Sequence, residues 1–205
     1  MTADLQPRPF GIPGVMLQPG DHVCALYLGT AERDAIILPF LREGLRLGEK
    51  CICVLDTTPP SDVLSAIGHG IDVHGSVASA QFMVCGCAEA YLRSGAFSGD
   101  DMLECWDGCI GEAIGGGYRF ARVTGEMPRT LRDPSERAAF FRYESELNRF
   151  LPRYPQALLC LYDLSLFGGG VLVDLLKTHP KLLVGGRLLE NPYCLTPEEY
   201  LATEG

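Results

Sequence analysis

Two patterns of hydrophobic and polar positions alternate along the chain. Short, nearly continuous apolar runs are typical of buried parallel strands, and between them apolar residues recur at helical spacing. Pro39 lies inside one helical pattern and predicts a kink or a later helix start. Strands are predicted at residues 22–28, 51–56, 82–87, 120–124 and 157–162, helices at 32–47, 61–67, 101–114, 135–151 and 171–177, and a last extended segment at 181–189.

The alternation of strands and helices predicts the α/β class. Parallel strands need crossover connections, so the expected architecture is a three-layer, mostly parallel open sheet with helices on both faces. Ligands of such sheets usually bind beyond the carboxyl ends of the strands. Residues 1–20, rich in Pro and Gly, are expected to be an N-terminal arm or tail, residues 21–201 a single domain, and residues 202–205 a C-terminal tail.

Charge and composition exclude several partners. The chain has 17 Lys and Arg against 26 Asp and Glu, a net charge of −9, and no basic run. This balance argues against direct binding of nucleic acid or of an anionic membrane surface. The first residues lack a secretory signal pattern, and no apolar segment approaches the roughly 20 residues of a membrane helix. We therefore expect a soluble, cytoplasmic protein.

Nine cysteines are many for a chain of 205 residues. In a reducing cytosol free thiols are the expectation. Thiols that share one face of a strand or helix could bind zinc or monovalent copper, but the C-x2-C spacing of zinc sites is absent and buried cysteines more often simply pack. The pairs that share a face are Cys51/Cys53, Cys85/Cys87 and Cys105/Cys109. If a metal binds, the first candidates are Cys85, Cys87 and His22.

The first strand, loop and helix resemble the opening of circadian-clock-type, RecA-like ATPases. The resemblance rests on the helix ending Phe40-Leu41-x-x-Gly44-Leu45-x-x-Gly48-Glu49. In those ATPases the loop carries GxxxxGK[ST], which holds the phosphates. Here residues 29–34 read GTAERD, without the Lys-Ser/Thr pair and with acidic residues instead. Nucleotide hydrolysis of the usual kind is therefore not expected.

A more specific resemblance, from about Gly20 to Leu201, is to the MEDS family, the methanogen/methylotroph sensory domain. It rests on the order and spacing of several short motifs. These are Asp21-His22-x4-Tyr27, the helix ending above, Tyr91-x3-Gly95-x-Phe97, Arg122-x-x-Gly125-Glu126-Met127, Tyr143-Glu144-x3-Asn148, Cys160-x-Tyr162-Asp163, His179-Pro180 and Asn191-Pro192-Tyr193.

The resemblance implies a non-catalytic cytoplasmic sensory domain with a RecA-like fold and a lost phosphate loop. Such a domain would bind a small molecule at the carboxyl edge of its sheet. Because the chain ends soon after the domain, its signal is expected to pass to a separate partner, a histidine-kinase-type or regulator protein. A homodimer is also expected from base rates. The alternatives are a Cys/His metal-binding or redox-sensing module, and a nucleotide-binding protein or enzyme with a modified pocket.

Each candidate residue also has a purely structural interpretation. His22 is either a ligand contact or a strand histidine bonded to a backbone carbonyl, and Glu126 is either a ligand-binding acid or an ion-pair partner of Arg122 or Arg129. Trp106 is expected in the core. The candidate ligand-binding residues are His22, Cys24, Tyr27, Cys87, Tyr91, Glu126, Tyr143, Glu144, Tyr162 and Asp163. No catalytic residue is predicted.

Overall fold

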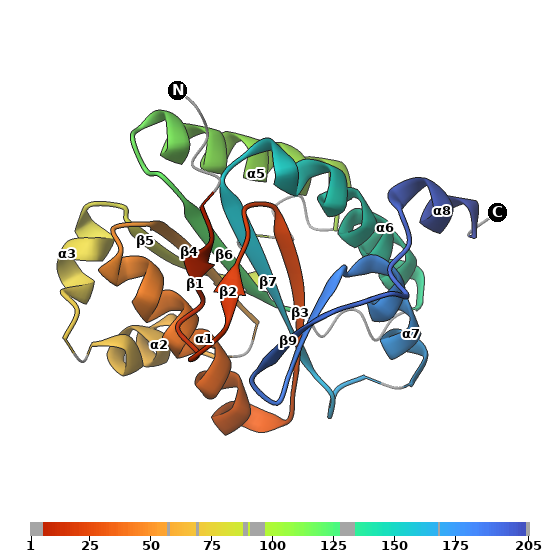
Figure 1. Ribbon diagram of the computed structural model, residues 1–205, viewed down its shortest axis with the longest axis horizontal. Helices are drawn as coiled ribbons and strands as arrows, with labels where there is room; N and C mark the ends of the chain where they lie inside the picture. Colours follow the sequence, from red (N-terminus) through yellow and green to blue (C-terminus); the bar gives the residue numbers. More distant parts are fainter. Residues whose placement is uncertain are drawn as a thin grey trace.

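A seven-stranded sheet, in the order β5-β4-β6-β7-β3-β8-β9, forms the centre of the computed structural model (Figure 1). The structure describes residues 6–56, 58–68, 70–87, 90, 97–127, 134–167 and 169–203. Neighbouring strands are parallel except for the antiparallel pair β8–β9. The strands are β3 (Asp21–Tyr27), β4 (Lys50–Leu55), β5 (Phe82–Gly86), β6 (Ala121–Glu126), β7 (Gln156–Asp163), β8 (Lys181–Val184) and β9 (Arg187–Glu190).

Helices cover both faces of the sheet, which confirms the predicted three-layer α/β fold (Figure 1). On one face, Ile37, Phe40 and Val63 bring α1 and α2 into the same apolar cluster as one side of the strands. On the other face, Trp106 and Leu147 bring α5 and α6 into a second cluster. The helices are α1 (Gly29–Arg46), α2 (Pro60–Ile67), α3 (Val73–Ala78), α5 (Gly99–Gly115), α6 (Pro134–Phe150), α7 (Gly169–Thr178) and α8 (Pro197–Ala202), with a 3-10 turn, η2 (Leu151–Arg153).

The strand order places a topological switch point between β4 and β6. From β4 the chain continues outward to β5, whereas from β6 it continues in the opposite direction to β7. Strands β4 and β6 pair directly, from Lys50↔Ala121 to Val54↔Gly125, so their carboxyl ends lie side by side. Crevices of this kind are the usual ligand sites of open α/β sheets. The fold therefore predicts a ligand site at the carboxyl ends of β4 and β6.

The N-terminal segment packs on the molecule as a hairpin. Strands β1 (Arg8–Pro9) and β2 (Met16–Leu17) pair antiparallel. The side chains of Phe10 and Leu17 are fully buried, and the Phe10 ring lies 5.1 Å from that of Phe40 in α1. Phe10, Val15 and Leu17 of this segment thus belong to the core on this face of the sheet, and residues 1–5 lie outside the described part of the chain.

Several element boundaries differ from those predicted. Helix α1 begins at Gly29, so residues 29–34 form its first turns instead of a loop, and it continues through Pro39. The segment expected to be one extended run at 181–189 is the hairpin β8–β9, because Gly185 and Gly186 adopt φ angles of 57° and 74° and reverse the chain. Among the described residues, no helix has the length and apolar character needed to cross a membrane.

Candidate functional site

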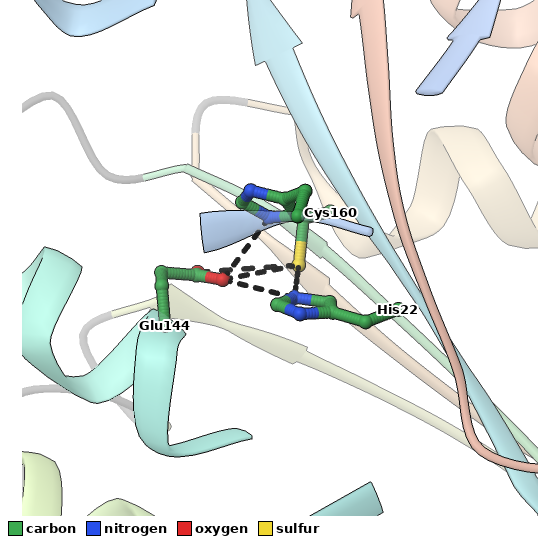
Figure 2. A group of neighbouring side chains, drawn as sticks. His22, Glu144 and Cys160 are labelled. Atoms are coloured by element: carbon green, nitrogen blue, oxygen red, sulfur yellow. Dashed lines mark hydrogen bonds and ion pairs between the residues drawn. The ribbon is translucent and has the colours of Figure 1, made fainter. Parts of the chain in front are cut away.

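Four chemically reactive side chains meet beneath the sheet, on the face covered by α6 and α7. Figure 2 shows Glu144 projecting from α6 toward His22 and Cys160, which come from two neighbouring strands. His22 is the second residue of β3, Cys160 lies in the middle of β7, and His179 follows the end of α7. All four are buried, with exposed fractions of 2% or less. We call this group the His–Glu–Cys cluster.

The potential metal-ligating atoms of the cluster converge on one point. Oε2 of Glu144 lies 3.0 Å from Nε2 of His22 and 3.2 Å from Nε2 of His179. Sγ of Cys160 lies 3.5 Å from Nε2 of His22 and 3.7 Å from Oε2 of Glu144. All four ligating atoms lie within 4.8 Å of one another.

The hydrogen bonds around the cluster fix the two imidazole rings. Nδ1 of His22 lies 2.9 Å from Oδ1 of Asn148, whose Nδ2 donates to the carbonyl of Thr178 at 2.7 Å. The oxygen of Asn148 is therefore the acceptor, and Nδ1 of His22 is the donor. Nδ1 of His179 lies 3.0 Å from the carbonyl of Leu175 and must also donate. Held in this way, both rings turn their Nε2 atoms toward the carboxylate of Glu144.

Burial governs the protonation of the cluster. Burial alone would raise the pKa of Glu144, but the close contacts of its carboxylate with His179 and His22 and the charge of these rings outweigh burial and place this pKa at about 2. Burial, with the charge of His22 next, lowers the pKa of His179. Burial also raises the pKa of the Cys160 thiol well above its usual value, and the Glu144 carboxylate raises it further. The cluster thus holds a buried carboxylate that requires positive charge beside it.

A second polar group lies at the carboxyl edge of the sheet, in the switch-point crevice. Oε2 of Glu126, the last residue of β6, accepts a hydrogen bond of 2.8 Å from the backbone amide of Asp56 after β4. Oε1 of Glu126 forms a 2.9 Å ion pair with Nη1 of Arg33 in α1, and Arg33 also donates to Oγ1 of Thr58. The side chains of the pair are 7% and 5% exposed. A buried guanidinium and carboxylate therefore face each other where ligands of this fold class bind.

Comparison with known proteins places the sequence of this chain in a family. The sequence profile of the MEDS family, described as the methanogen/methylotroph, DcmR sensory domain, matches residues 21–180. This chain belongs to the MEDS family. It is also 30% identical over 172 residues to the transcriptional repressor DcmR of Methylorubrum extorquens (strain DSM 6343 / CIP 106787 / DM4), an alignment that covers 82% of this chain and 61% of that repressor. The family and this relative support a sensory or regulatory role.

The MEDS domain separates the candidate ligand residues into three places. Tyr143 lies between α5 and α6, where its hydroxyl accepts a 2.8 Å hydrogen bond from Nε1 of Trp106, a core residue as predicted. Tyr91 lies outside the described residues. Candidates that lie in or beside the His–Glu–Cys cluster are His22, Cys24, Glu144 and Tyr162, and those at the carboxyl edge are Tyr27, Cys87, Glu126 and Asp163.

The carboxyl-edge candidates have specific local partners. The thiol of Cys87 donates to the carbonyl of Glu126 at 3.3 Å. Burial raises the pKa of the Tyr27 hydroxyl, and the nearby charges of Glu126 and Asp163 raise it further, so this hydroxyl is a neutral hydrogen-bonding group. Asp163 accepts hydrogen bonds from the backbone and hydroxyl of Ser165 and so shapes the turn after β7.

Two expectations about charged and metal-binding pairs need correction. Arg122 stands at the start of β6, not near its end, and pairs with Glu49 at 2.6 Å, whereas Glu126 pairs with Arg33. The other predicted partner of Glu126, Arg129, lies outside the described residues. Cys85 and Cys87 belong to β5 and the residues after it, which β4, β6 and β7 separate from His22. Four strand spacings amount to about 19 Å, too far for one metal ion to bridge.

Arg33 and His179 are site residues that the sequence did not predict. Arg33 lies within a helix and has no motif of its own, so only the fold brings it to Glu126. His179 was visible in the His179-Pro180 motif, and Asn148 in the motif of Glu144. Neither motif indicated that His179 and Asn148 lie next to His22. The MEDS motifs thus contain the whole His–Glu–Cys cluster, although they are spread over 158 positions.

Proposed function

We propose that this MEDS domain is a non-catalytic sensory module that binds a small polar organic molecule at the carboxyl edge of its sheet. In this proposal it passes a conformational change to a separate histidine-kinase-type or regulator protein. Membership of a sensory family and similarity to a transcriptional repressor support the regulatory role. The chain spans about 61% of the length of that repressor, so the similarity supports a regulatory role and does not identify the partner or the ligand.

The observation that carries the proposal is the buried Arg33–Glu126 pair beside a cavity. This cavity, of about 340 Å³, lies between α1 and α2, and its lining includes Thr30, Arg33, Leu38 and Thr58. In this lining the guanidinium of Arg33 offers donors and the hydroxyl of Thr58 offers a donor and an acceptor, while the carboxylate of Glu126 lies outside the lining and holds Arg33 in place. A ligand that carries an acceptor such as a carboxylate or carbonyl, together with a hydroxyl or amine donor, would match these groups.

The same pair provides a route for the signal. Arg33 belongs to α1, whereas Glu126 ends β6 and also holds the backbone at the end of β4. A ligand that competes for either group would favour a different position of α1 relative to the strand ends. A two-state equilibrium of this kind shifts only as far as the ligand binds the two states differently. The proposal therefore requires that the ligand contact the pair itself.

The non-catalytic part of the proposal is supported by the start of α1. Oε2 of Glu32 accepts a 2.8 Å hydrogen bond from the backbone amide of Leu28, the N-cap residue of this helix. In a phosphate-binding loop, amides at this helix terminus would face the phosphate. Here a carboxylate of the chain itself occupies such a position, and the Lys-Ser/Thr pair is absent from the sequence of residues 29–34.

Thermal unfolding with a panel of short-chain organic acids, hydroxy acids and amines tests the ligand site. We expect at least one compound to raise the Tm of the wild-type protein and of Glu49→Gln, and to leave the Tm of Glu126→Gln unchanged. Glu49→Gln is the matched control, because it disrupts another buried Arg–Glu pair, with Arg122, at the opposite end of β6. A compound that raises the Tm of all three proteins equally would contradict the proposed site. ATP turnover that is lost in Glu126→Gln would contradict the non-catalytic role.

A second cavity, of about 680 Å³, lies between α5 and α6 and is a second candidate location for the ligand. Its lining includes Gly99, Leu103, Arg142 and the predicted ligand residue Tyr143. Because Trp106, the single tryptophan, donates to the Tyr143 hydroxyl, a ligand in this cavity would change tryptophan fluorescence. The fluorescence response and its loss in Tyr143→Phe would distinguish this cavity from the Arg33–Glu126 site.

A further inference from the structure

We propose that His22, Glu144, Cys160 and His179 form a metal site for zinc or a similar divalent transition metal ion. The site would bind through Nε2 of both histidines, one carboxylate oxygen of Glu144 and Sγ of Cys160. It lies on the α6 and α7 face of the sheet and does not depend on the ligand site at the Arg33–Glu126 pair.

The spacing of the four ligating atoms fits tetrahedral coordination. With Zn–N and Zn–O bonds of about 2.0–2.1 Å and Zn–S bonds of about 2.3 Å, adjacent ligand atoms of a tetrahedron lie about 3.3–3.6 Å apart. The distances in the cluster that join Glu144 to the two histidines are 3.0 and 3.2 Å, and those that join Cys160 to His22 and Glu144 are 3.5 and 3.7 Å. Small side-chain rotations would bring these distances to the tetrahedral values.

The hydrogen bonds outside the cluster are those expected of metal-binding histidines. A ligating imidazole commonly donates its other N–H to a carbonyl or carboxylate oxygen, which fixes its orientation. Here Nδ1 of His22 donates to the amide oxygen of Asn148, and Nδ1 of His179 donates to the carbonyl of Leu175. Asn191 reinforces the second arrangement, because its Nδ2 donates to the carbonyl of His179 at 2.7 Å. Both Nε2 lone pairs are thereby directed at the centre of the cluster.

One buried nitrogen atom of the cluster has no hydrogen bond, and a bond to a metal ion would satisfy it. Nε2 of His179 is fully buried and makes no hydrogen bond of acceptable geometry, although it lies 3.2 Å from Oε2 of Glu144. A single metal ion would bind both Nε2 atoms and the carboxylate together, and it would supply the positive charge that the buried Glu144 requires beside it.

The ligand set indicates the class of metal and the role of the site. Two imidazoles, a thiolate and a carboxylate suit zinc and chemically similar ions, and do not suit magnesium or calcium, which prefer oxygen ligands. The carboxylate and thiolate would supply two negative charges to balance a divalent ion, so the buried complex would be neutral. With four protein ligands and no solvent exposure, the site would be structural and join β3 and β7 to α6 and to the residue after α7.

Metal analysis of the protein, purified without an affinity tag, tests the proposal. We expect about one zinc per chain after growth in zinc-supplemented medium. Replacement of zinc by Co²⁺ is expected to give an intense tetrahedral visible spectrum and a near-ultraviolet thiolate-to-cobalt band. Cys160→Ser should lose the near-ultraviolet band, and His179→Gln should retain less than about a tenth of the bound metal. Cys53→Ser is the matched control, because it changes an equally buried thiol on β4 and should keep both the metal and the band.

The spectrum of the wild-type protein keeps the proposal falsifiable if a cluster variant fails to fold. A wild-type protein that binds neither zinc nor cobalt in stoichiometric amount, or whose cobalt spectrum lacks the thiolate band, would overturn the proposal. So would a folded Cys160→Ser variant with an undiminished thiolate band. The cluster would then be a proton-linked ionic network.

Discussion

Asn148 joins His22 to the end of α7 through a single side-chain amide. Its oxygen accepts the hydrogen bond from Nδ1 of His22 at 2.9 Å, and its nitrogen donates to the carbonyl of Thr178 at 2.7 Å. Thr178 directly precedes His179, so one amide positions both histidines of the cluster. Asn148 is thus a positioning residue that does not itself contact the proposed metal ion.

Replacing Asn148 by Leu should weaken zinc binding without removing a ligand. The variant leaves Nδ1 of His22 without its acceptor, and loss of such outer hydrogen bonds typically lowers metal affinity about 10–100-fold. Asn148→Asp should restore much of the affinity, because a carboxylate still accepts from His22. Competition with a chromophoric chelator measures the affinity. Arg149→Gln, an exposed change on the same helix, is the control and should bind like wild type. Equal affinity of Asn148→Leu and wild type would show that the amide does not position the ligand.

Gly44 predicts a large stability difference between two glycine-to-alanine substitutions. A Cβ atom at Gly44 would lie 2.6 Å from Cδ of Arg122 and 2.7 Å from Sγ of Cys51, both buried. We expect Gly44→Ala to lower the free energy of unfolding by about 1–3 kcal/mol through overpacking. Gly108→Ala in α5, where a Cβ meets nothing within 4 Å, should raise it by about 0.5–1 kcal/mol. Urea unfolding of the two variants measures both changes, and a stability equal to wild type in Gly44→Ala would contradict the packing seen here.

Gly44 also shows how far the sequence could predict this fold. Its place in the motif of the first helix was visible, but the reason for a glycine there is Arg122, a residue 78 positions away on β6. The central strands and most helices were predictable because apolar runs and helical periodicity are local signals. The β8–β9 hairpin was not predicted, because its two strands are only four residues each and the Gly185-Gly186 turn between them interrupts the apolar pattern only briefly.

The candidate sites were only partly predictable for the same reason. His22, Glu144 and Glu126 could be selected from their motifs and from their places on predicted elements. Their partners could not, because the strand order β5-β4-β6-β7-β3 decides which motifs meet, and nothing local in the sequence specifies that order. This is why the sequence did not predict that Arg33 pairs with Glu126, and why it grouped Cys85 and Cys87 with a histidine four strands away.

The cysteines should divide into two reactivity classes. All nine are free thiols, of which five are buried and four are partly exposed, namely Cys85, Cys105, Cys109 and Cys194. Burial raises the pKa of the Cys51 thiol to about 12 and keeps that of Cys53 well above its usual value, so thiolate is scarce at neutral pH. A thiol-specific chromogenic reagent should therefore label at most four cysteines in the native protein and nine after denaturation. Rapid labelling of five or more native thiols would contradict this division and favour the redox-sensing alternative.

The start of α1 predicts that ATP and GTP do not bind. Glu32 caps the amide of Leu28, and Asp34 pairs with Arg33 at 2.7 Å, so carboxylates lie where a phosphate would need positive charge. Calorimetric titration with either nucleotide and Mg²⁺ should give no saturable heat up to millimolar concentration. Glu32→Gln is the informative control: it removes one negative charge but supplies no Lys-Ser/Thr pair, so it should remain unable to bind. Saturable binding by the wild-type protein would contradict the proposed non-nucleotide sensor, and binding that appears only in Glu32→Gln would show that this one carboxylate is what closes an otherwise competent phosphate site.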